Sequence, residues 1–348
     1  MDVRKDTGME ILKQFAQEAK KLNGTIIFAE GDEDRTLEAA VKLVNDGICK
    51  VIVVAPKAEM IQATAQKKNL DISRLAVMVP AVDKLDKTVL EAYLKLMEVK
   101  GTSREDALKL AADPLTFSAL YVKSGKASGC VAGARSSTPD VIRAALRGIG
   151  AAPGTKFISS FFLMIPPEKS CQDCVTRPVI YADCGVNPDP SANGLRDIAI
   201  ASIHSFRSLF PKENPRIAFL SFSTKGSAEH RMLQKIIDAT KMTQEYFKDD
   251  PSVIIDGELQ FDAAAVPAVA KRKAPNSPVA GQANIFIFPD LNAGNICYKV
   301  TERLGCFTAI GPLLQGLALP MNDLSRGCSV DDIYYAAVIA LLKSRTLK

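Results

Sequence analysis

The chain has 348 residues, of which 47% are hydrophobic, 24% charged and 6% aromatic, with no Trp. This length and hydrophobic content favour more than one buried core, and therefore about two domains. The formal charge of +5 comes from Lys and Arg spread among nearly as many Asp and Glu. That balance suits small anionic ligands and argues against nucleic acid as a partner, because a nucleic-acid groove needs a concentrated basic face.

Apolar side chains recur at helical spacing between Ile11 and Leu22, with charged residues between them. The segment lacks the continuous apolar run of a signal peptide, so we predict an amphipathic helix instead. No stretch elsewhere reaches the roughly 18 uninterrupted apolar residues that a membrane helix needs. We therefore expect a cytoplasmic protein with no membrane partner.

A short β-branched run, a loop containing Gly and Asp, and a helix recur along the chain. The pattern opens at 25–44, returns at 50–66 and 126–148, and a second series follows between 175 and 305. Apolar runs without alternation indicate strands covered on both faces. The predicted class is α/β, with two three-layer αβα domains whose sheets are mainly parallel.

The segment "RGIGAAPGTKF" is rich in Gly and Pro, which indicates a domain boundary near residue 150. The last helix is predicted from Val330 to about Lys343, and its periodicity leaves open which domain it joins. We predict that the C-terminal segment completes a first domain of residues 1–150 plus 314–348. The second domain is then residues 151–313.

Polar residues and glycines lie where the predicted strands end. They are Glu30, Gly31, 133–138, Asn187, 223–226, 256–260 and 290–295. Ligands of open parallel sheets bind beyond the carboxyl ends of the strands. Two sheets that offer such loops to each other would form an interdomain active-site cleft, so we expect a small-molecule enzyme.

Common signatures of phosphate, nucleophile and metal sites are absent. The sequence contains no GxxxxGK[ST], no GxGxxG after a strand, no GxSxG and no HExxH. The two histidines, His204 and His230, fall in helical patterns, so a Ser/His/Asp arrangement lacks its base. Cys171 and Cys174 form an isolated CxxC, which favours free thiols over zinc. We expect no metal.

The string "GARSSTPDVIRAAL" predicts a helix whose amino terminus attracts anions. Ser137 or Thr138 is a suitable N-cap, and Pro139 suits the first turn. Backbone N–H groups there attract phosphate, and Arg143 adds a guanidinium one turn further. The alternative is that Arg143 is simply a solvated helix residue.

A polar run precedes the closing helix in "PMNDLSRGCSVDDIYYAA". Ser329 and Asp332 have the spacing of a capping box, which is a structural explanation for the carboxylate. Ser325 and Arg326 lie just before that cap, in a loop where an arginine can reach a phosphate or an oxyanion. Spacing alone leaves both explanations of Asp332 open.

Two long strings, "FPDLNAGNICYKVTERLG" and "GPLLQGLALPMNDLSRGCSVDDI", resemble the phosphate acetyltransferase family. "YADCGVNPDPSA", "LSFSTKGSA", "DGELQFDAA" and "KAPNSPVAGQANIFIFPDL" support the resemblance, which covers nearly the whole chain. Phosphate butyryltransferases share the fold, but the "QGxxxPxNDLSRG" form is more similar to the acetyl branch.

The resemblance implies reversible acetyl transfer, acetyl-CoA + phosphate ⇌ acetyl phosphate + CoA, in a homodimer. It implies CoA and acetyl-CoA as substrates and no tightly bound cofactor. Its catalytic positions correspond to Ser325, Arg326 and Asp332, where Asp332 accepts the thiol proton and the other two stabilise the transition state. The expected substrate-binding residues are Arg143, Ser137, Thr138, Asn295 and Lys299.

One departure concerns the segment "YLKLMEVKG", which places Met97 where the family pattern has an arginine. Lys95, Lys100 or another cation would then have to supply the missing contact. Three alternatives remain open: a propionyl- or butyryl-preferring phosphate acyltransferase, a non-catalytic acyl-CoA-sensing module, and a two-domain metal-dependent hydroxyacid dehydrogenase. The last would need an Asp ligand cluster, which the sequence does not offer.

Overall fold

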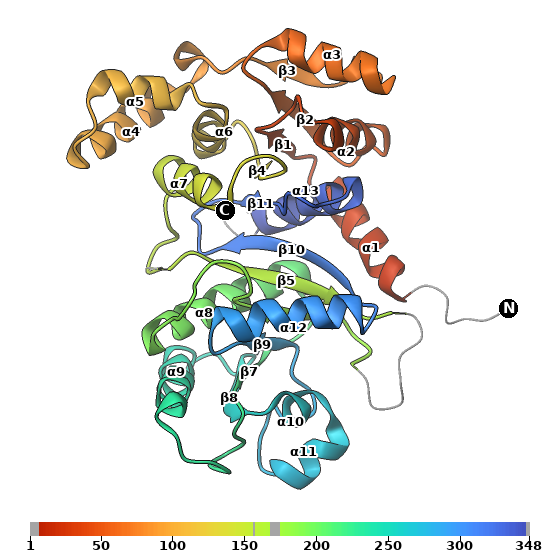
Figure 1. Ribbon diagram of the computed structural model, residues 1–348, viewed down its shortest axis with the longest axis vertical. Helices are drawn as coiled ribbons and strands as arrows, with labels where there is room; N and C mark the ends of the chain where they lie inside the picture. The colour runs from red at the N-terminus through yellow and green to blue at the C-terminus, as the bar shows by residue number, and fades with distance from the viewer. Residues whose placement is uncertain (1–6, 156, 168–174, 346–348) are drawn as a thin grey trace, which may run out of the picture. The chain divides into compact units, whose positions relative to one another are not determined.

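The computed structural model describes residues 7–155, 157–167 and 175–345. The chain divides into two compact units, and both are built on a β-sheet with helices against it (Figure 1). The first unit is Leu12–Pro153 with Leu317–Lys348, and the second is Met1–Ile11 with Gly154–Gly316. The predicted α/β class, with two mainly parallel sheets, is confirmed, whereas the interdomain cleft stays a prediction.

The sheet of the first unit has five strands among the described residues, in the order β11-β4-β1-β2-β3, and every pair is parallel. Helices α2 and α13 pack on one face of this sheet, and α6 and α7 pack on the other (Figure 1). Its elements in chain order are α1 (Thr7–Lys21, in this unit from Leu12), β1 (Thr25–Phe28), α2 (Asp34–Asn45), β2 (Lys50–Val54), α3 (Ala58–Lys68), β3 (Ala76–Met78), the 3₁₀ helix η1 (Val82–Lys84), α4 (Lys87–Val99), α5 (Arg104–Ala111), α6 (Pro114–Lys123), β4 (Gly129–Ala132), α7 (Thr138–Gly148), β11 (Met321–Asp323) and α13 (Val330–Ser344).

The sheet of the second unit has six strands among the described residues, in the order β10-β5-β6-β9-β7-β8. Helices α8 and α9 cover one face, and α10 and α12 lie on the other (Figure 1). Its elements are β5 (Ser159–Ile165), β6 (Val179–Ala182), α8 (Ala192–Leu209), β7 (Arg216–Leu220), α9 (Arg231–Tyr246), β8 (Ile254–Leu259), α10 (Phe261–Ala265), α11 (Pro267–Lys273), β9 (Ile285–Ile287), α12 (Leu291–Arg303) and β10 (Thr308–Gln315).

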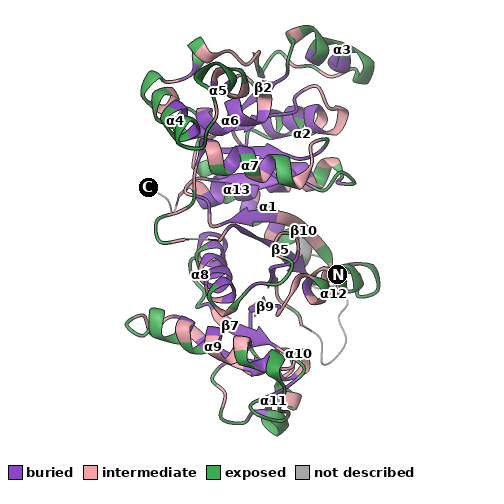
Figure 2. Cartoon of the chain, turned by 60° about the vertical axis from the view of Figure 1, so that its left-hand side comes forward, coloured by how far each residue is buried: buried purple, intermediate pink, exposed green. Residues whose placement is uncertain are grey.

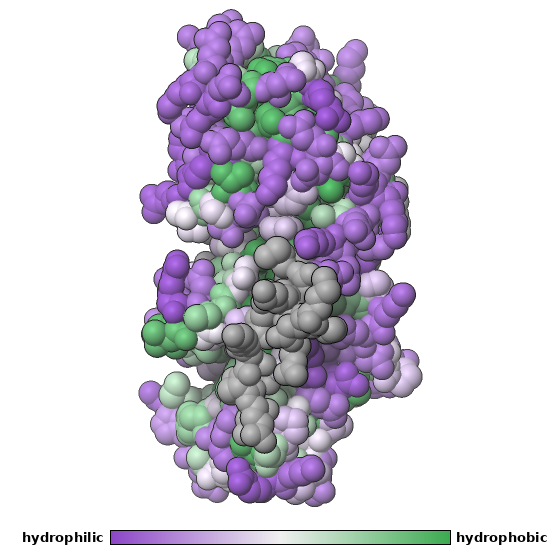
Figure 3. Space-filling view, turned by 90° about the vertical axis from the view of Figure 1, so that its right-hand side faces the viewer, coloured by the Kyte–Doolittle hydropathy of each residue, from purple (hydrophilic) through white to green (hydrophobic). Residues whose placement is uncertain are grey.

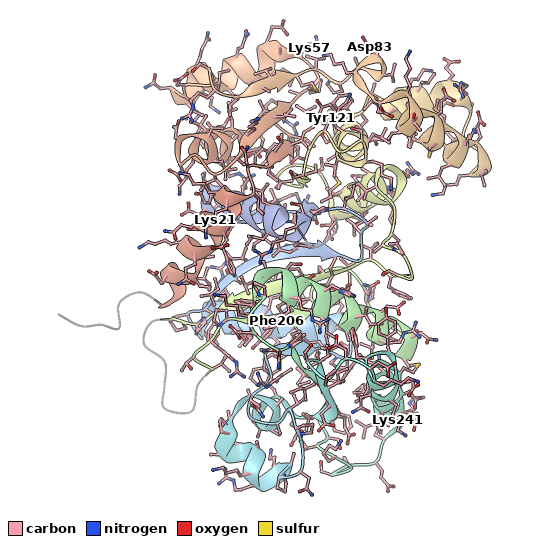
Figure 4. All side chains as sticks on the ribbon, turned by 180° about the vertical axis from the view of Figure 1, so that it is seen from behind. Lys21, Lys57, Asp83, Tyr121, Phe206 and Lys241 are labelled. Atoms are coloured by element: carbon pink, nitrogen blue, oxygen red, sulfur yellow. The ribbon has the colours of Figure 1, made fainter. Side chains whose placement is uncertain are left out.

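Buried strands and helices form the two cores. The central strands and α13 are drawn as buried in Figure 2, and α13 buries apolar residues on nearly all sides from Ile333 to Leu342. In the second unit Phe206 of α8, labelled in Figure 4, is only 1% exposed. Hydrophilic side chains predominate on the face drawn in Figure 3. Both cores therefore follow the apolar runs of the sequence.

Strands β5 and β10 are the main feature that the sequence pattern did not predict. They pair with each other in antiparallel fashion, and β5 also runs antiparallel to β6. All seven residues of β5 are buried, so the strand shows no alternation of apolar and polar residues. The described residues between β5 and β6, 166–167 and 175–178, contain no helix, so the strand–loop–helix rhythm is not seen in them.

Some finer predictions are corrected. His204 lies in α8 as expected, but His230 caps α9 rather than lying inside it, and its Nδ1 accepts the N–H of Met232 at 3.3 Å. Helix α7 is capped by Ser137 and not by Thr138, which is its first residue. Cys171 and Cys174 lie outside the described residues.

No helix among residues 7–155, 157–167 and 175–345 combines the length and the hydropathy required to cross a bilayer.

Candidate active site

Two loops of the first unit lie side by side at the carboxyl ends of their strands. Strands β4 and β11 are neighbours, with Ala132 opposite Asp323 at their ends. The loop 133–137 follows β4, and the loop 324–329 follows β11. Ser137, Thr138 and the start of α7 therefore lie at the same sheet edge as Ser325 and Arg326.

A buried carboxylate holds the first of these loops. Glu30, 3% exposed, follows β1 and accepts backbone N–H groups from Gly133 at 3.0 Å, Ala134 at 2.8 Å and Ser136 at 2.7 Å. Such consecutive N–H groups would otherwise form an anion-binding nest. Since Glu30 already occupies them, a phosphate at this edge has to rely on donors further along the loop and on side chains.

Arg35 ties the two loops together. It lies in the first turn of α2, where its Nε donates to Glu33 Oε1 at 2.8 Å. Its Nη1 donates to the carbonyl oxygens of Arg326 at 2.9 Å and Cys328 at 2.8 Å, and its Nη2 donates to Ala134 O at 3.1 Å. The planar guanidinium thus fixes the backbone at Arg326 and Cys328 relative to the β4 loop.

The sequence analysis missed Arg35. The signal was available, because "GDEDRT" follows a buried strand directly and so lies at the edge where ligands bind. Its contacts are with carbonyl oxygens that are distant in sequence, so no local pattern could have predicted them.

A second connection joins Asp323 to α7. Asp323 is fully buried, and its Oδ2 accepts the hydroxyl of Thr138 at 2.5 Å, while its Oδ1 has no hydrogen-bond partner among the described residues. Burial raises the pKa of Asp323 to about 6, although the Thr138 hydrogen bond lowers it, and the nearby charge of Glu30 adds to the increase. Thr138, predicted to bind substrate, is therefore engaged in a structural hydrogen bond.

Ser325 and Arg326 are both exposed in the second loop. Ser325 Oγ accepts the N–H of Gly327 at 3.3 Å, which leaves its hydroxyl hydrogen available to donate. The guanidinium of Arg326 makes no hydrogen bond or ion pair within the described part of the chain. An exposed and unpaired guanidinium next to a free hydroxyl is suited to bind an oxyanion.

Asp332 forms the predicted capping box at the start of α13. Its Oδ2 accepts the N–H of Ser329 at 2.8 Å and the Ser329 hydroxyl at 2.9 Å, and Ser329 Oγ accepts the N–H of Asp332. Its Oδ1 makes no hydrogen bond with any described residue. The structural explanation is thus confirmed, and it leaves one carboxylate oxygen available for a proton.

Arg143 is exposed on α7, where it forms an ion pair with Asp140 one turn earlier. Asp140 also accepts the hydroxyl of Ser137 at 2.6 Å, and these two contacts, Ser137 first, lower its pKa. A ligand phosphate would therefore have to compete with Asp140 for Arg143. Exposed ion pairs contribute little stability, about 0 to 1 kcal/mol, so this competition is weak.

Asn295 and Lys299 belong to helix α12 of the second unit. The Nδ2 of Asn295 donates to Cys184 O at 3.1 Å, and Lys299 Nζ lies 5.7 Å from the ring centre of Tyr298. Neither contact identifies a ligand, so their role in substrate binding stays a prediction.

Met97, at the position of the expected arginine, lies on the inner side of α4 and is only 1% exposed. Lys95 and Lys100 are exposed on the same segment. The methionine therefore contributes to packing, and only the neighbouring lysines are accessible to an anion.

Cysteine and metal chemistry receive no support from the described residues. Cys328 is buried beside the Ser325–Arg326 loop, and burial raises the pKa of its thiol to about 11 despite the nearby charge of Arg35. At neutral pH it is a protonated thiol and a poor nucleophile. In the part of the chain that the structure describes, no three His, Cys, Asp or Glu residues gather as a metal site.

Comparison with known proteins identifies the family of the chain. A family model described as "Phosphate acetyl/butaryl transferase" matches residues 10–341. The chain belongs to this family. The resemblance inferred from the sequence is thereby confirmed.

Relatives within the family match over almost their full lengths. The phosphate acetyltransferase of Acetivibrio thermocellus is 42% identical over 346 residues, which cover 98% of this chain and 100% of the relative. The phosphate acetyltransferase of Clostridium acetobutylicum is 40% identical over 337 residues, which cover 97% of this chain and 99% of the relative. Among solved structures, the EutD phosphotransacetylase from Staphylococcus aureus superposes with a TM-score of 0.86 at 38% identity, covering 97% and 98%.

The raised pKa of Asp323 predicts a characteristic pH dependence. In the folded state the carboxyl holds its proton up to about pH 6, whereas in the unfolded chain it loses it near 3.8, so its contribution to stability is lost as the pH rises through this range. Asn at this position cannot ionise, so the Asp323→Asn variant does not lose this stability as the pH rises. Between pH 4 and pH 7 we expect the unfolding free energy of the variant to rise by about 2 kcal/mol relative to the parent.

Urea unfolding at a series of pH values measures this difference. Asp83→Asn is the control, because Asp83, labelled in Figure 4, is exposed and should leave the pH profile unchanged. Parallel profiles for the parent and Asp323→Asn would show that Asp323 ionises normally.

The contacts of Arg35 predict that Arg35→Lys loosens the loop 325–328. Lysine keeps the charge, but its compact ammonium lacks the planar fork that reaches carbonyl oxygens of both loops, so amide hydrogen exchange in this loop should become about 10-fold faster. Arg135→Lys is the matched control, since Arg135 pairs with Asp32 at the surface and contacts neither Arg326 nor Cys328. Unchanged exchange in Arg35→Lys would contradict the positioning role.

Proposed function

We propose that this protein is a phosphate acetyltransferase, which transfers an acetyl group reversibly between coenzyme A and inorganic phosphate. One observation carries the proposal: Ser325, Arg326 and Asp332 lie within eight residues at one loop–helix junction. Among the described residues, the Arg326 guanidinium, the Ser325 hydroxyl hydrogen and one Asp332 carboxylate oxygen have no hydrogen-bond partner. Membership of the family and the names of its relatives support the substrate class.

The proposed reaction is a direct attack within a ternary complex. In the direction of acetyl-CoA synthesis, the CoA sulfur attacks the carbonyl carbon of acetyl phosphate while its proton passes to Asp332. The tetrahedral intermediate then collapses, the carbon–oxygen bond to phosphate breaks, and phosphate leaves with the bonding electron pair. In water a thiol has a pKa near 8.5 and an aspartate near 3.9, so we expect proton transfer to accompany the attack rather than precede it.

Arg326 and Ser325 would act on the charge that develops during this step. The carbonyl oxygen becomes an oxyanion, and the Arg326 guanidinium and Ser325 hydroxyl donate to it or to the phosphoryl oxygens. Arg143 would bind the phosphate, with Ser137, Thr138, Asn295 and Lys299 completing the substrate contacts. Thr138 would then bind through its backbone, because its hydroxyl is held by Asp323.

A covalent acyl-enzyme is disfavoured. Cys328 is buried with a raised pKa, and no described histidine lies in either loop of the site to activate Ser325. The mechanism also requires no resident metal or tightly bound cofactor.

We further infer that the chain works in the cytoplasm in acetate metabolism, as two domains with boundaries near residues 150 and 313. Preference for acetyl over propionyl or butyryl groups is part of the proposal, although one methylene changes discrimination by only about 1 to 3 kcal/mol.

A homodimer is the proposed assembly, and an apolar stripe on α12 supports it. Ile296, Val300 and Leu304 follow one another at intervals of four residues and are 62%, 49% and 82% exposed. Residues four apart share one face of a helix, so the three side chains form a continuous apolar strip. Strips of this kind on soluble proteins commonly mark an interface.

The catalytic proposal is tested by phosphate-dependent release of free thiol from acetyl-, propionyl- and butyryl-CoA. We expect release to favour acetyl-CoA in the parent protein, and kcat to fall by about 10²- to 10³-fold in Arg326→Ala and at least as far in Asp332→Asn. Binding of acetyl-CoA without any thiol release, even with abundant phosphate, would favour the acyl-CoA-sensing module.

Loss of the helix cap is the confounding effect in Asp332→Asn. Ser329→Ala breaks the same capping box but keeps the carboxylate, and it should cost about 1 kcal/mol of stability while kcat stays within a few-fold of the parent. If Ser329→Ala loses as much activity as Asp332→Asn, Asp332 acts as a cap and not as a base.

The α12 strip predicts that Val300→Glu with Leu304→Glu converts a dimer to monomers, because charges in an apolar interface lose their hydration. Light scattering coupled to size-exclusion chromatography measures the mass. Val99→Glu is the control, since Val99 is an apolar residue with 87% exposure on α4, away from the α12 strip in sequence. A dimer that persists in the double variant would place the interface elsewhere.

A further inference from the structure

A basic hollow lies at the amino-terminal edge of the first unit's sheet. It has a volume of about 560 Å³ and is lined by the first residues of three strands, Thr25 of β1, Lys50 of β2 and Ala76 of β3. Because the strands are parallel, this edge is opposite the one that carries Ser325 and Arg326. The hollow is therefore separate from the proposed active site, and its size is within the range of small-molecule pockets.

Four cationic side chains line this hollow: Lys20, Lys50, Arg74 and Lys126. No carboxylate is among the described residues that line it. Asp46, close by, accepts Lys20 Nζ through its carbonyl oxygen, and its carboxylate accepts the hydroxyl of Tyr334 at 3.0 Å. The positive charge around the hollow is therefore not neutralised by its own lining.

The hydrogen bonds that these cations make go to neutral acceptors. Lys20 Nζ donates to Asp46 O at 3.0 Å, Arg74 Nη1 to Asn45 Oδ1 at 3.3 Å, and Lys126 Nζ to Lys84 O at 3.2 Å. The side chain of Lys50 makes no hydrogen bond or ion pair with any described residue. None of the four forms an ion pair within the described part of the chain, so each keeps donors for an anion.

The lining also indicates what kind of anion fits. Several close positive charges favour a ligand with more than one negative charge, because such an anion attracts each cation and offsets the repulsion between the cations. The described lining contains no Phe, Tyr or His, so it offers no ring on which a base could stack. Recognition would depend on phosphate groups alone.

We propose that this hollow is a binding site for polyphosphate groups, such as inorganic pyrophosphate or the phosphate chain of a nucleotide. The site does not depend on the acyltransferase proposal, because it shares no residue with the catalytic loops. Binding there stabilises the folded first unit by mass action.

Calorimetric titration of the full-length protein with pyrophosphate at low ionic strength tests the proposal. Lys50→Ala combined with Arg74→Ala removes two of the four cations, and we expect the Kd to increase by about 10-fold or more. The control is Lys57→Ala combined with Lys87→Ala, which removes the same charge from exposed positions of the same unit, with Lys57 labelled in Figure 4. We expect the control variant to bind pyrophosphate with unchanged affinity. Circular dichroism should show that both double variants are folded.

Pyrophosphate binding at the catalytic loops is distinguished by a third variant, Arg143→Ala with Arg326→Ala. Binding that persists in this variant and weakens in Lys50→Ala/Arg74→Ala supports the hollow. The reverse pattern overturns the proposal, and equal weakening in the Lys57/Lys87 control reduces it to a general charge effect. ATP should bind within about 10-fold of pyrophosphate, whereas adenosine should not bind, since the lining has no stacking surface.

Discussion

The guanidinium of Arg35 is the contact on which the candidate site depends most. Arg326 and Cys328 lie in a loop with no regular backbone pairing, and Ala134 lies in another. The planar guanidinium donates to carbonyl oxygens of both loops, because its N–H groups point outward in a fixed fork. Glu33 orients that fork, and Glu30 fixes the β4 loop from behind. Positions of the exposed reactive groups are thus set by side chains that would never touch a substrate.

At this sheet edge two acidic side chains are buried and two arginines are exposed. Carboxylates are buried, with Glu30 and Asp323 at 3% and 0% exposure, whereas Arg326 and Arg143 are exposed in front of them. The carboxylate oxygens of Glu30 accept backbone N–H groups, and no hydrogen bond joins them to the guanidinium of Arg326 among the described residues. Asp323 has only one hydrogen-bonded oxygen, and its raised pKa is the electrostatic cost of that position. An arginine left without an acidic partner is free to bind an anionic ligand.

Much of the fold and part of the site could be predicted from the sequence. The strand–loop–helix rhythm predicts parallel sheets covered by helices, and the Ser329–Asp332 spacing predicts the cap of α13 correctly. The antiparallel strands β5 and β10 could not be predicted, because an all-buried strand has no periodicity and the direction of pairing depends on partners far along the chain. The contacts of Arg35 and Asp323 could not be predicted for a related reason. Their partners, Arg326 O and Thr138 Oγ, are separated from them by 291 and 185 residues.

The composition of the first unit affects how the chain can fold during synthesis. Strand β4 pairs with β11 and α2 packs against α13, yet Pro153 and Leu317 are separated by the whole second unit. At typical rates of translation those intervening residues, roughly 160 of them, take on the order of 10 to 30 s to emerge from the ribosome. During that interval the edge of β4 and the apolar face of α2 are exposed in the nascent chain, where other chains or chaperones can bind them. The second unit is nearly continuous in sequence and can complete its core first, so the two loops of the site come together only after β11 and the loop that follows it have emerged.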